Sequence, residues 1–554
     1  MTAKRFINGR DKAVGVMDKK TKISLLFIFS LLFLICFFRE WKRSETVWIR
    51  FMQDASPETA ITAEIQTKDD RITTHAFPSV DGNYFLFLPS WTEGKFLAMD
   101  GFAASFPART LESGICVAID QEHTLTILTG SEIPSVFFTL EHDLSYISSD
   151  KTFSDTGQAF ILDADGTNVY AGTLKKIKGR GNTSWEQEKK PYNITLENTA
   201  SISENNSRTS EFALVASSDI SFLRNRISNE MARAMEAPYM EGGCINLYIN
   251  GSFQGVYEMY QKIAPDSLGI WDLESETEQL NRFQNSISQL TTGTTLDDWN
   301  HSITGKWWNY EKNPDNITGG YLLEMDHAGR YADETSGFIL TSGAYVVSKS
   351  PSLLSEAQYQ YISSYIQECE NAMIPGAANN SGRELSQYID IPSFAAKYLV
   401  EEVSKNIDCS STSQYFYKDR DGILYAGPVW DYDWAYGVER TQENIDYLDP
   451  EGFSAREVPG TLKWWQLLYY NKEVYHTIVR TYEETLYPYL NQLAQSEFHL
   501  WKEEIEKSAV MDYIRWNRSD TSDIEEARDY YNSEADAVLD FLMKRKEFLH
   551  REWG

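Results

Sequence analysis

Residues 405–437 read KNIDCSSTSQYFYKDRDGILYAGPVWDYDWAYG, and this stretch places acidic side chains at the ends of two consecutive strands. Asp408 lies in a polar, serine-rich bend before an aromatic strand, and a second strand ends in Asp431 and Asp433. Carboxylates beside buried aromatic side chains are costly unless they are paired or bind a metal ion. A capped strand end or a calcium-binding turn would explain the pattern as well, so the rest of the chain has to decide.

The whole chain narrows the function classes. Its 554 residues predict roughly three domains. With 51 basic and 81 acidic residues, the net charge of −30 argues against a nucleic-acid partner, which would require a basic face. Five cysteines and eight histidines are scattered without CxxC or HExxH spacing. This dispersal argues against a disulfide framework and against a zinc hydrolase.

The N-terminus predicts a membrane anchor. Seven basic residues lie in a tail over residues 1–22, and the apolar segment 23–38 (ISLLFIFSLLFLICFF) follows. Its 16 residues are short against the roughly 20 that span a bilayer, but Lys22 and Arg39 can extend to the two interfaces. A buried core helix is the alternative. No A-x-A-like cleavage site follows, so we expect a single-pass signal anchor with a cytoplasmic N-terminus and an extracytoplasmic main domain.

Three further regions are expected after the anchor. Residues 44–152 alternate short β-rich runs with turns and predict a β-rich module. Residues 158–450 predict a mixed α+β domain, and residues 460–554 a helical C-terminal region.

Within the mixed domain, apolar residues at helical spacing predict a helix over residues 219–235 with Asp219 as its N-cap. Asn250-Gly251 predicts the turn of a β-hairpin. Residues 264–317 are polar and weakly patterned, and we interpret them as an insertion or linker.

A glycine-bearing turn precedes a strand in residues 178–196, KGRGNTSWEQEKKPYNITL. Gly179 and Gly181 bracket Arg180, and two lysines stand at the start of the strand. Exposed backbone N–H groups with a nearby cation suit a phosphate group. Taken alone, the pattern is equally typical of a solvated hairpin.

The order of these features parallels protein kinases. Phosphoryl transfer requires Mg²⁺ held by carboxylates, a cation on the phosphates and a group that orients the attacking hydroxyl. In protein kinases a loop aspartate acts as base and a metal-binding aspartate follows two strands later. Here Asp431 follows Asp408 by 23 residues across two strand-like runs, and the glycine turn, the lysines and a helix come before both.

Several blocks in this order resemble the spore-coat CotH family of atypical kinases. The matching blocks are GRGNTSW, KKPYNITL, SDISFLRNRIS, INLYINGSFQGVY, GGYLLEMD, NID and PVWDYDWAYG, and they extend over residues 170–440. The resemblance implies a divergent, two-lobed protein-kinase-like fold of the α+β class. It also implies transfer of phosphate from ATP to Ser or Thr hydroxyls of a protein, with Mg²⁺ or Mn²⁺ as cofactor.

The resemblance assigns roles to individual residues. Asp408 matches the catalytic aspartate, Asp431 the metal-binding aspartate, and Asp433 is a candidate second ligand. The remaining candidates are Lys190 as the catalytic, phosphate-contacting lysine, with Arg180 and Asn182 in the nucleotide-binding loop.

The sequence departs from the family where an asparagine often follows the catalytic aspartate. Ser413 and Gln414 stand there, and of the two Gln414 is the better metal ligand because its carbonyl oxygen can coordinate. Glu230 on the predicted helix is a candidate partner for Lys190, although an exposed helical glutamate is an equal alternative.

Two functions therefore stay open. The first is a membrane-anchored, CotH-like kinase with a protein substrate and no nucleic-acid partner. The second is a catalytically silent surface or spore-coat scaffold that uses the same fold, since ATP is scarce outside the cytoplasm. Lys190, Asp408 and Asp431 together favour the first, because a scaffold needs none of them.

Overall fold

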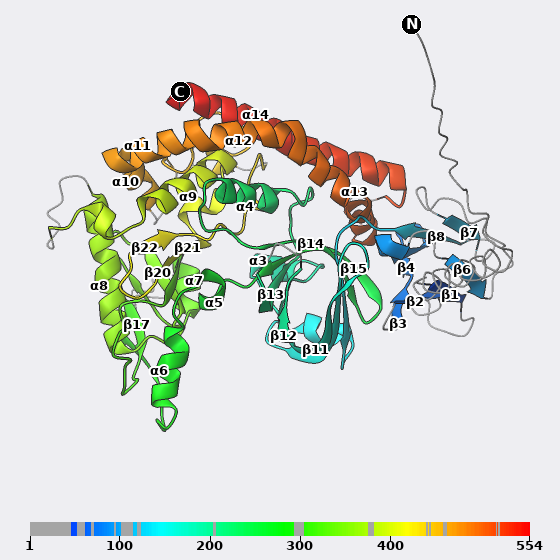
Figure 1. Cartoon of the computed structure of the whole chain (residues 1–554), viewed down its shortest axis with the longest axis horizontal. Helices are drawn as coiled ribbons and strands as arrows, with labels where there is room; N and C mark the ends of the chain where they lie inside the picture. The colour runs from blue at the N-terminus through cyan, green and yellow to red at the C-terminus, as the bar shows by residue number, and fades with distance from the viewer. Residues whose placement is uncertain are drawn as a thin grey trace, which may run out of the picture.

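The computed structural model describes residues 46–51, 61–67, 71–92, 96–100, 115–118, 123–202, 207–292, 304–374, 382–438, 441–442, 445–457, 463–516, 518 and 521–554. The basic tail and the predicted anchor at residues 23–38 lie outside these residues. None of the helices in the described part of the chain combines the length and the apolar composition that a membrane crossing requires. The predicted α+β class is confirmed, since sheets and helices both build the molecule (Figure 1).

The first lobe is a β-barrel. Seven strands follow one another in the order β13-β12-β11-β10-β9-β14-β15, and β13 also pairs with β15, which closes the sheet on itself. Their bounds are Thr209–Val215, Tyr192–Ala200, Asn168–Gly179, Ser154–Leu162, Ser135–Leu140, Gly242–Ile249 and Ser252–Gln261, in that order. Alternate apolar side chains such as Phe138, Ile161, Leu247 and Met259 fill its interior.

Local sequence explains the barrel's central hairpin. Asn250 and Gly251 join β14 to β15 with φ angles of 49° and 80°, as the sequence predicts. A side chain at Gly251 would also collide with His75, because a Cβ there meets the ring at 2.5 Å. Asn250 and Gly251 thus adopt the backbone conformation that the turn requires, and Gly251 also leaves room for the His75 ring.

The β-rich N-terminal region is continuous with the barrel. Strands β3, β2, β1 and β6 extend the barrel sheet beyond β15, and four others form a separate sheet in the order β4-β5-β8-β7. The bounds of the eight are Arg71–His75, Ile61–Gln66, Thr46–Phe51, Phe96–Asp100, Phe77–Pro78, Tyr84–Leu88, Thr124–Thr129 and Ile115–Ala118. Since β9 is hydrogen-bonded between β10 and β14, the boundary predicted at residue 152 does not interrupt the sheet.

The second lobe is built on a seven-stranded sheet in the order β16-β17-β19-β20-β18-β21-β22. Its strands are Gln289–Thr292, Gly305–Trp308, Gly337–Ile339, Tyr345–Ser350, Tyr321–Asp326, Gln414–Lys418 and Leu424–Ala426, in that order. Because β16 and β17 belong to this sheet, and Trp307 is buried in its core, the interpretation of residues 264–317 as an insertion or linker is wrong. A two-stranded ribbon, β23 (Thr441–Gln442) and β24 (Ile445–Asp446), lies apart from it.

Helices connect and cover the sheets. The α-helices before the C-terminal region are α2 (Leu144–Ser149), α3 (Thr183–Glu186), α4 (Arg224–Ala234), α5 (Pro265–Leu268), α6 (Leu273–Asn281), α7 (Ala328–Asp333), α8 (Glu356–Met373) and α9 (Ile391–Ser404). The short 3₁₀ helices are η1 (Ser90–Thr92), η3 (Leu385–Gln387) and η4 (Ile407–Ser410). Helix α4 begins at Arg224, later than predicted, because Asp219 accepts the Arg224 N–H from a turn that precedes the helix (2.8 Å).

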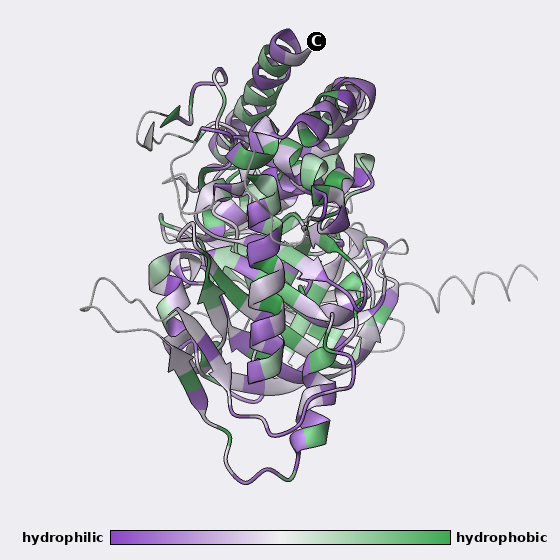
Figure 2. Cartoon of the chain, turned by 90° about the vertical axis from the view of Figure 1, so that its left-hand side faces the viewer, coloured by the Kyte–Doolittle hydropathy of each residue, from purple (hydrophilic) through white to green (hydrophobic). Residues whose placement is uncertain are grey.

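The C-terminal region is helical, as its spacing predicts, and lies across both lobes (Figure 1). Its α-helices are α10 (Trp464–Tyr470), α11 (Lys472–Thr481), α12 (Tyr487–Gln492), α13 (Phe498–Arg515) and α14 (Ile524–Trp553). Two π-helical segments, η5 (Tyr482–Leu486) and η6 (Leu493–Glu497), lie on either side of α12. Helix α13 contacts β15 of the barrel, whereas α11 and α14 contact α9 of the second lobe. Figure 2 shows hydrophobic residues gathered where sheets and helices meet in the middle of the molecule.

Candidate functional site

A cleft of about 1180 Å³ lies between the barrel and the seven-stranded sheet. Strands β11, β12 and β13 line one wall, and β18, β20 and β21 line the other. Ligand pockets usually measure about 300–1,000 Å³. The cleft is therefore large enough for a nucleotide and part of an acceptor.

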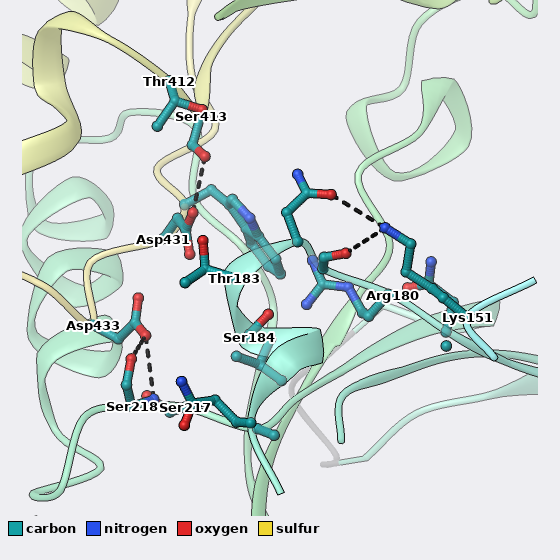
Figure 3. A pocket seen from close by; sticks show the side chains of 18 of the residues that line it. Lys151, Arg180, Thr183, Ser184, Ser217, Ser218, Thr412, Ser413, Asp431 and Asp433 are labelled. Carbon is teal, nitrogen blue, oxygen red and sulfur yellow. Dashed lines mark hydrogen bonds between the residues drawn. The ribbon is translucent and has the colours of Figure 1, made fainter. Parts of the chain in front are cut away.

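The glycine turn forms one edge of this cleft. Gly179 ends β11 against the ring of Trp185, where a Cβ would lie 2.5 Å from the ring. Gly181 has a φ of 76°, a left-handed conformation that favours glycine. Lys151 fixes the turn from outside by donating to the Gly181 carbonyl (2.9 Å) and to Asn182 Oδ1 (3.2 Å), as Figure 3 shows.

Arg180 extends from this turn toward the second lobe. Its guanidinium lies 5.1 Å from the centre of the Trp430 ring. Burial lowers the pKa of Arg180, and the charges of Asp431 and Asp433 oppose this shift. The turn therefore places one cation opposite the two carboxylates that follow β22.

Asp408 reaches the cleft on η4, directly after α9 ends. Lys405 terminates α9 in a left-handed conformation with a φ of 50°. Asn406 then caps the short helix, because its Oδ1 accepts the Asp408 N–H at 3.1 Å. The Asp408 side chain is half-buried and lines the cleft, as a group that contacts an acceptor must.

Asp431 and Asp433 enter the same cleft on the opposite loop (Figure 3). Tyr432 between them is buried, whereas Asp431 and Asp433 both line the cleft. Asp431 accepts a hydrogen bond from Ser413 Oγ at 2.9 Å, and Asp433 accepts one from the Ser218 N–H at 3.2 Å. Burial and the neighbouring Asp431 raise the pKa of Asp433 to about 7. Asp431 thus accepts a hydrogen bond from one hydroxyl, and Asp433 accepts from both the N–H and the Oγ of Ser218.

Asp431 and Asp433 fit a magnesium site in which the protein supplies only some of the ligands. In the described ranges, no three His, Cys, Asp or Glu side chains converge as a complete metal cage. Mg²⁺ usually takes one or two carboxylates and completes its shell with water and substrate phosphates. Asp431 and Asp433 meet that requirement.

Gln414 is not brought to this site. It is fully buried in β21 and does not line the cleft. Its Nε2 donates to the Thr412 carbonyl at 3.4 Å. Ser413, which has a left-handed φ of 56° just before β21 begins, instead contacts Asp431.

The two adjacent lysines lie in a bend before β12 and differ in their contacts. Lys190 donates to the Trp185 carbonyl at 2.6 Å, lies 5.1 Å from the centre of that ring, and does not line the cleft. Lys189 lines the cleft and is buried, with its Nζ 2.5 Å from Asp512 Oδ2 on α13. Burial lowers the pKa of Lys189 to about 8 against the effect of Asp512. Glu230 pairs with Arg233.

The C-terminal region supplies site residues that the sequence did not suggest. Trp516 and Arg518 line the cleft, and Arg518 Nε lies 2.9 Å from Asp512 Oδ1. No short motif marks these positions, since they reach the cleft only through the packing of α13 on β15.

Two further acids lie at the end of β18. Burial raises the pKa of Glu324 to about 7, opposed by Lys349, and Asp326 accepts from Thr412 Oγ1 at 2.8 Å. The block GGYLLEMD carries a usable signal for them, because alternate carboxylates in a buried strand require partners.

A comparison of the sequence with models of known protein families finds a match that includes most of the residues that line the cleft. A family model described as "CotH kinase protein" matches residues 177–549, which extends from β11 through the second lobe into α14. The match crosses the boundary predicted between residues 450 and 460 and includes the C-terminal helices. No curated protein matches the chain.

Proposed function

This chain belongs to the CotH kinase protein family, and we propose that it is a metal-dependent kinase that transfers phosphate from a nucleotide to Ser or Thr hydroxyls of a protein. One observation carries the proposal. The glycine turn, Arg180, Asp408 and the Asp431–Asp433 pair come from segments far apart in sequence, and all of them line one cleft. A scaffold has no need for this convergence.

The residues divide into three roles. Asp431 and Asp433 hold the divalent cation, Mg²⁺ or Mn²⁺, which neutralises phosphate oxygens when bound. Arg180 and Lys189 supply positive charge for the phosphates, and the turn through Asn182 covers them with backbone N–H groups.

Asp408 orients the acceptor hydroxyl and accepts its proton. Its backbone is fixed by Asn406, and its side chain stays accessible in the cleft. General-base catalysis needs only hydrogen-bond reach to the hydroxyl, so Asp408 does its part without a metal contact.

The proposal includes a location. The apolar segment 23–38 and the seven basic residues before it support a signal anchor with the catalytic lobes outside the cytoplasm. The acceptor is then a protein of that compartment, and ATP has to reach it there.

Thermal stabilisation of the full chain by ATP tests the function. A ligand that binds only the folded state stabilises it by about 2.7 kcal/mol when present at roughly 100 times its Kd. We expect ATP with Mg²⁺ or Mn²⁺ to raise the melting temperature, and ATP with EDTA to leave it unchanged. Absence of any metal-dependent shift would refute the kinase and leave the scaffold.

A further inference from the structure

A single buried carboxylate connects the two acidic loops of the cleft. Glu401, in the last turn of α9, has no exposed surface. One of its oxygens contacts the loop of Asp408, and the other contacts the loop of Asp431 and Asp433. We propose that Glu401 is a positioning residue that sets the two loops relative to each other. The inference rests on the proposed roles of those three aspartates.

The first set of hydrogen bonds (the first arm) links Glu401 through Asn406 to the backbone of Asp408. Glu401 Oε2 accepts from Asn406 Nδ2 at 2.9 Å, and Asn406 Oδ1 in turn accepts the Asp408 N–H at 3.1 Å. The Asn406 side chain is 1% exposed, so water does not compete for either bond. The orientation of the Asn406 amide, and with it the η4 backbone, therefore depends on Glu401.

The second set of hydrogen bonds (the second arm) links Glu401 to Tyr432 in the loop of Asp431 and Asp433. Glu401 Oε1 accepts from Tyr432 Oη at 2.7 Å, and Tyr432 is the residue between Asp431 and Asp433. The Tyr432 N–H donates to Asn225 Oδ1 on α4 at 2.8 Å, which holds the loop from the other side. Burial and the Glu401 carboxylate raise the pKa of Tyr432 well above its usual value, so the hydroxyl stays a donor.

The charge of Glu401 is balanced inside the network. Lys397 Nζ lies 2.8 Å from Glu401 Oε1 and 2.9 Å from Tyr432 Oη. A negative charge in the last turn of a helix interacts unfavourably with the helix dipole. A buried carboxylate at this position is therefore stable only when it is paired and hydrogen-bonded. An apolar residue would be sufficient for helix packing alone. The hydrogen bonds from Asn406 and Tyr432 require a side chain with two acceptor oxygens.

The neighbouring Glu402 provides a matched control. It is equally buried in the same turn of α9. Its carboxylate binds Arg545 of α14 and accepts the Ser454 N–H at 2.6 Å. Glu402 therefore ties α9 to the C-terminal helices and contacts neither acidic loop through its side chain.

Hydrogen exchange of the full chain without ligand tests the inference directly. Loss of a hydrogen bond to a charged group is worth about 1.5–3 kcal/mol, so local exchange should rise at least about tenfold. In Glu401→Gln we expect this rise in peptides that cover Asp408 and in those that cover Tyr432. In Glu402→Gln we expect it near Ser454 and at neither loop.

Two single-arm variants keep the test decisive if Glu401→Gln does not fold. Tyr432→Phe should raise exchange around Tyr432 alone and weaken Mg²⁺-nucleotide binding. Asn406→Ala should raise exchange around Asp408 alone and lower kcat with unchanged nucleotide affinity. Unchanged exchange at both loops in Glu401→Gln, or an equal rise at both in Glu402→Gln, would overturn the inference. If the wild-type chain binds no nucleotide, the proposed function fails while the exchange result still decides the role of Glu401.

Discussion

Lys189 and Asp512 form a buried ion pair of 2.5 Å although 323 residues separate them in the sequence. Asp512 Oδ2 also accepts the Val256 N–H of β15 at 2.9 Å. Gly255 leaves room for this carboxylate, since a Cβ there would lie 2.2 Å from Oδ2. The pair therefore joins the cleft wall, the barrel and helix α13 at one point.

Asp512→Ala should destabilise the fold strongly. It leaves Lys189 buried without its counter-charge and the Val256 N–H without an acceptor, which costs about 3–5 kcal/mol. Urea unfolding measures the loss. The control is Asp536→Ala, which removes an exposed pair with Lys502 between α13 and α14 and should cost less than about 1 kcal/mol. Equal effects of the two variants would contradict the structural role of Asp512.

Lys189→Met and Lys190→Met should differ in nucleotide binding. Lys189 lines the cleft, whereas Lys190 is bonded to the Trp185 carbonyl outside it. Loss of a charged hydrogen bond to phosphate is worth about 1.5–3 kcal/mol, or more than about tenfold in Kd. Calorimetry with ATP and Mg²⁺, well below the melting temperature, should show this loss for Lys189→Met only. The opposite order would restore the role that the sequence assigns to Lys190.

Asp431→Ala and Asp408→Asn should fail in different ways. Removing Asp431 takes an anionic ligand from a hard cation, so metal-dependent nucleotide binding should be lost. Asp408→Asn should bind ATP normally and lose phosphoryl transfer by about 10²-fold or more, because only the hydroxyl loses its base. Calorimetry and transfer of labelled phosphate separate the two effects. If both acids are structural, both variants will melt earlier with no metal-specific change.

Glu258 should make stability depend on pH. It is 1% exposed, and burial together with Asp219 raises its pKa to about 8 from 4.5. The folded state then holds a proton that the unfolded state releases, so stability falls as pH rises from about 4.5 to 8. The raised pKa corresponds to a change in unfolding free energy on the order of 5 kcal/mol. Glu258→Gln keeps an acceptor for Asn225 and should remove this part of the slope, as urea unfolding at pH 5 and pH 8 in EDTA can show.

The predicted anchor leads to a test on cells. Protease added to cells stripped of any wall or outer layer should degrade the chain beyond Trp48, because the seven basic residues before segment 23–38 hold the N-terminus inside. A control with permeabilised cells shows that the cytoplasmic tail is also cleavable. Protection of the main domain in intact cells would place it in the cytoplasm.

Local signals in the sequence predicted local structure well. The Asn250-Gly251 turn lies between β14 and β15, and the C-terminal region is helical as its apolar spacing indicates. Asp408, Asp431 and Asp433 all line one cleft, which their order in the sequence suggested. A few neighbouring residues determine the turn and the helices, whereas the convergence of the three aspartates also requires the tertiary fold.

The closure of the barrel and the remaining site residues depend on long-range contacts, which no local sequence pattern predicts. Closure of the barrel needs β13 to pair with β15, and Lys189 lines the cleft from a bend that precedes β12. The part played by α13 could not be foreseen, since Asp512 resembles any helical aspartate until it is placed beneath Gly255.

The helices that cross both lobes restrict how the cleft can move. Asp512 fastens α13 to the barrel, and Arg545 on α14 fastens the same region to Glu402 of the second lobe. Many two-lobed enzymes admit and release nucleotides by hinge rotation of one lobe against the other. Here the same helical region is joined to each lobe by a buried ion pair, so a hinge rotation of one lobe against the other would have to break one of these pairs.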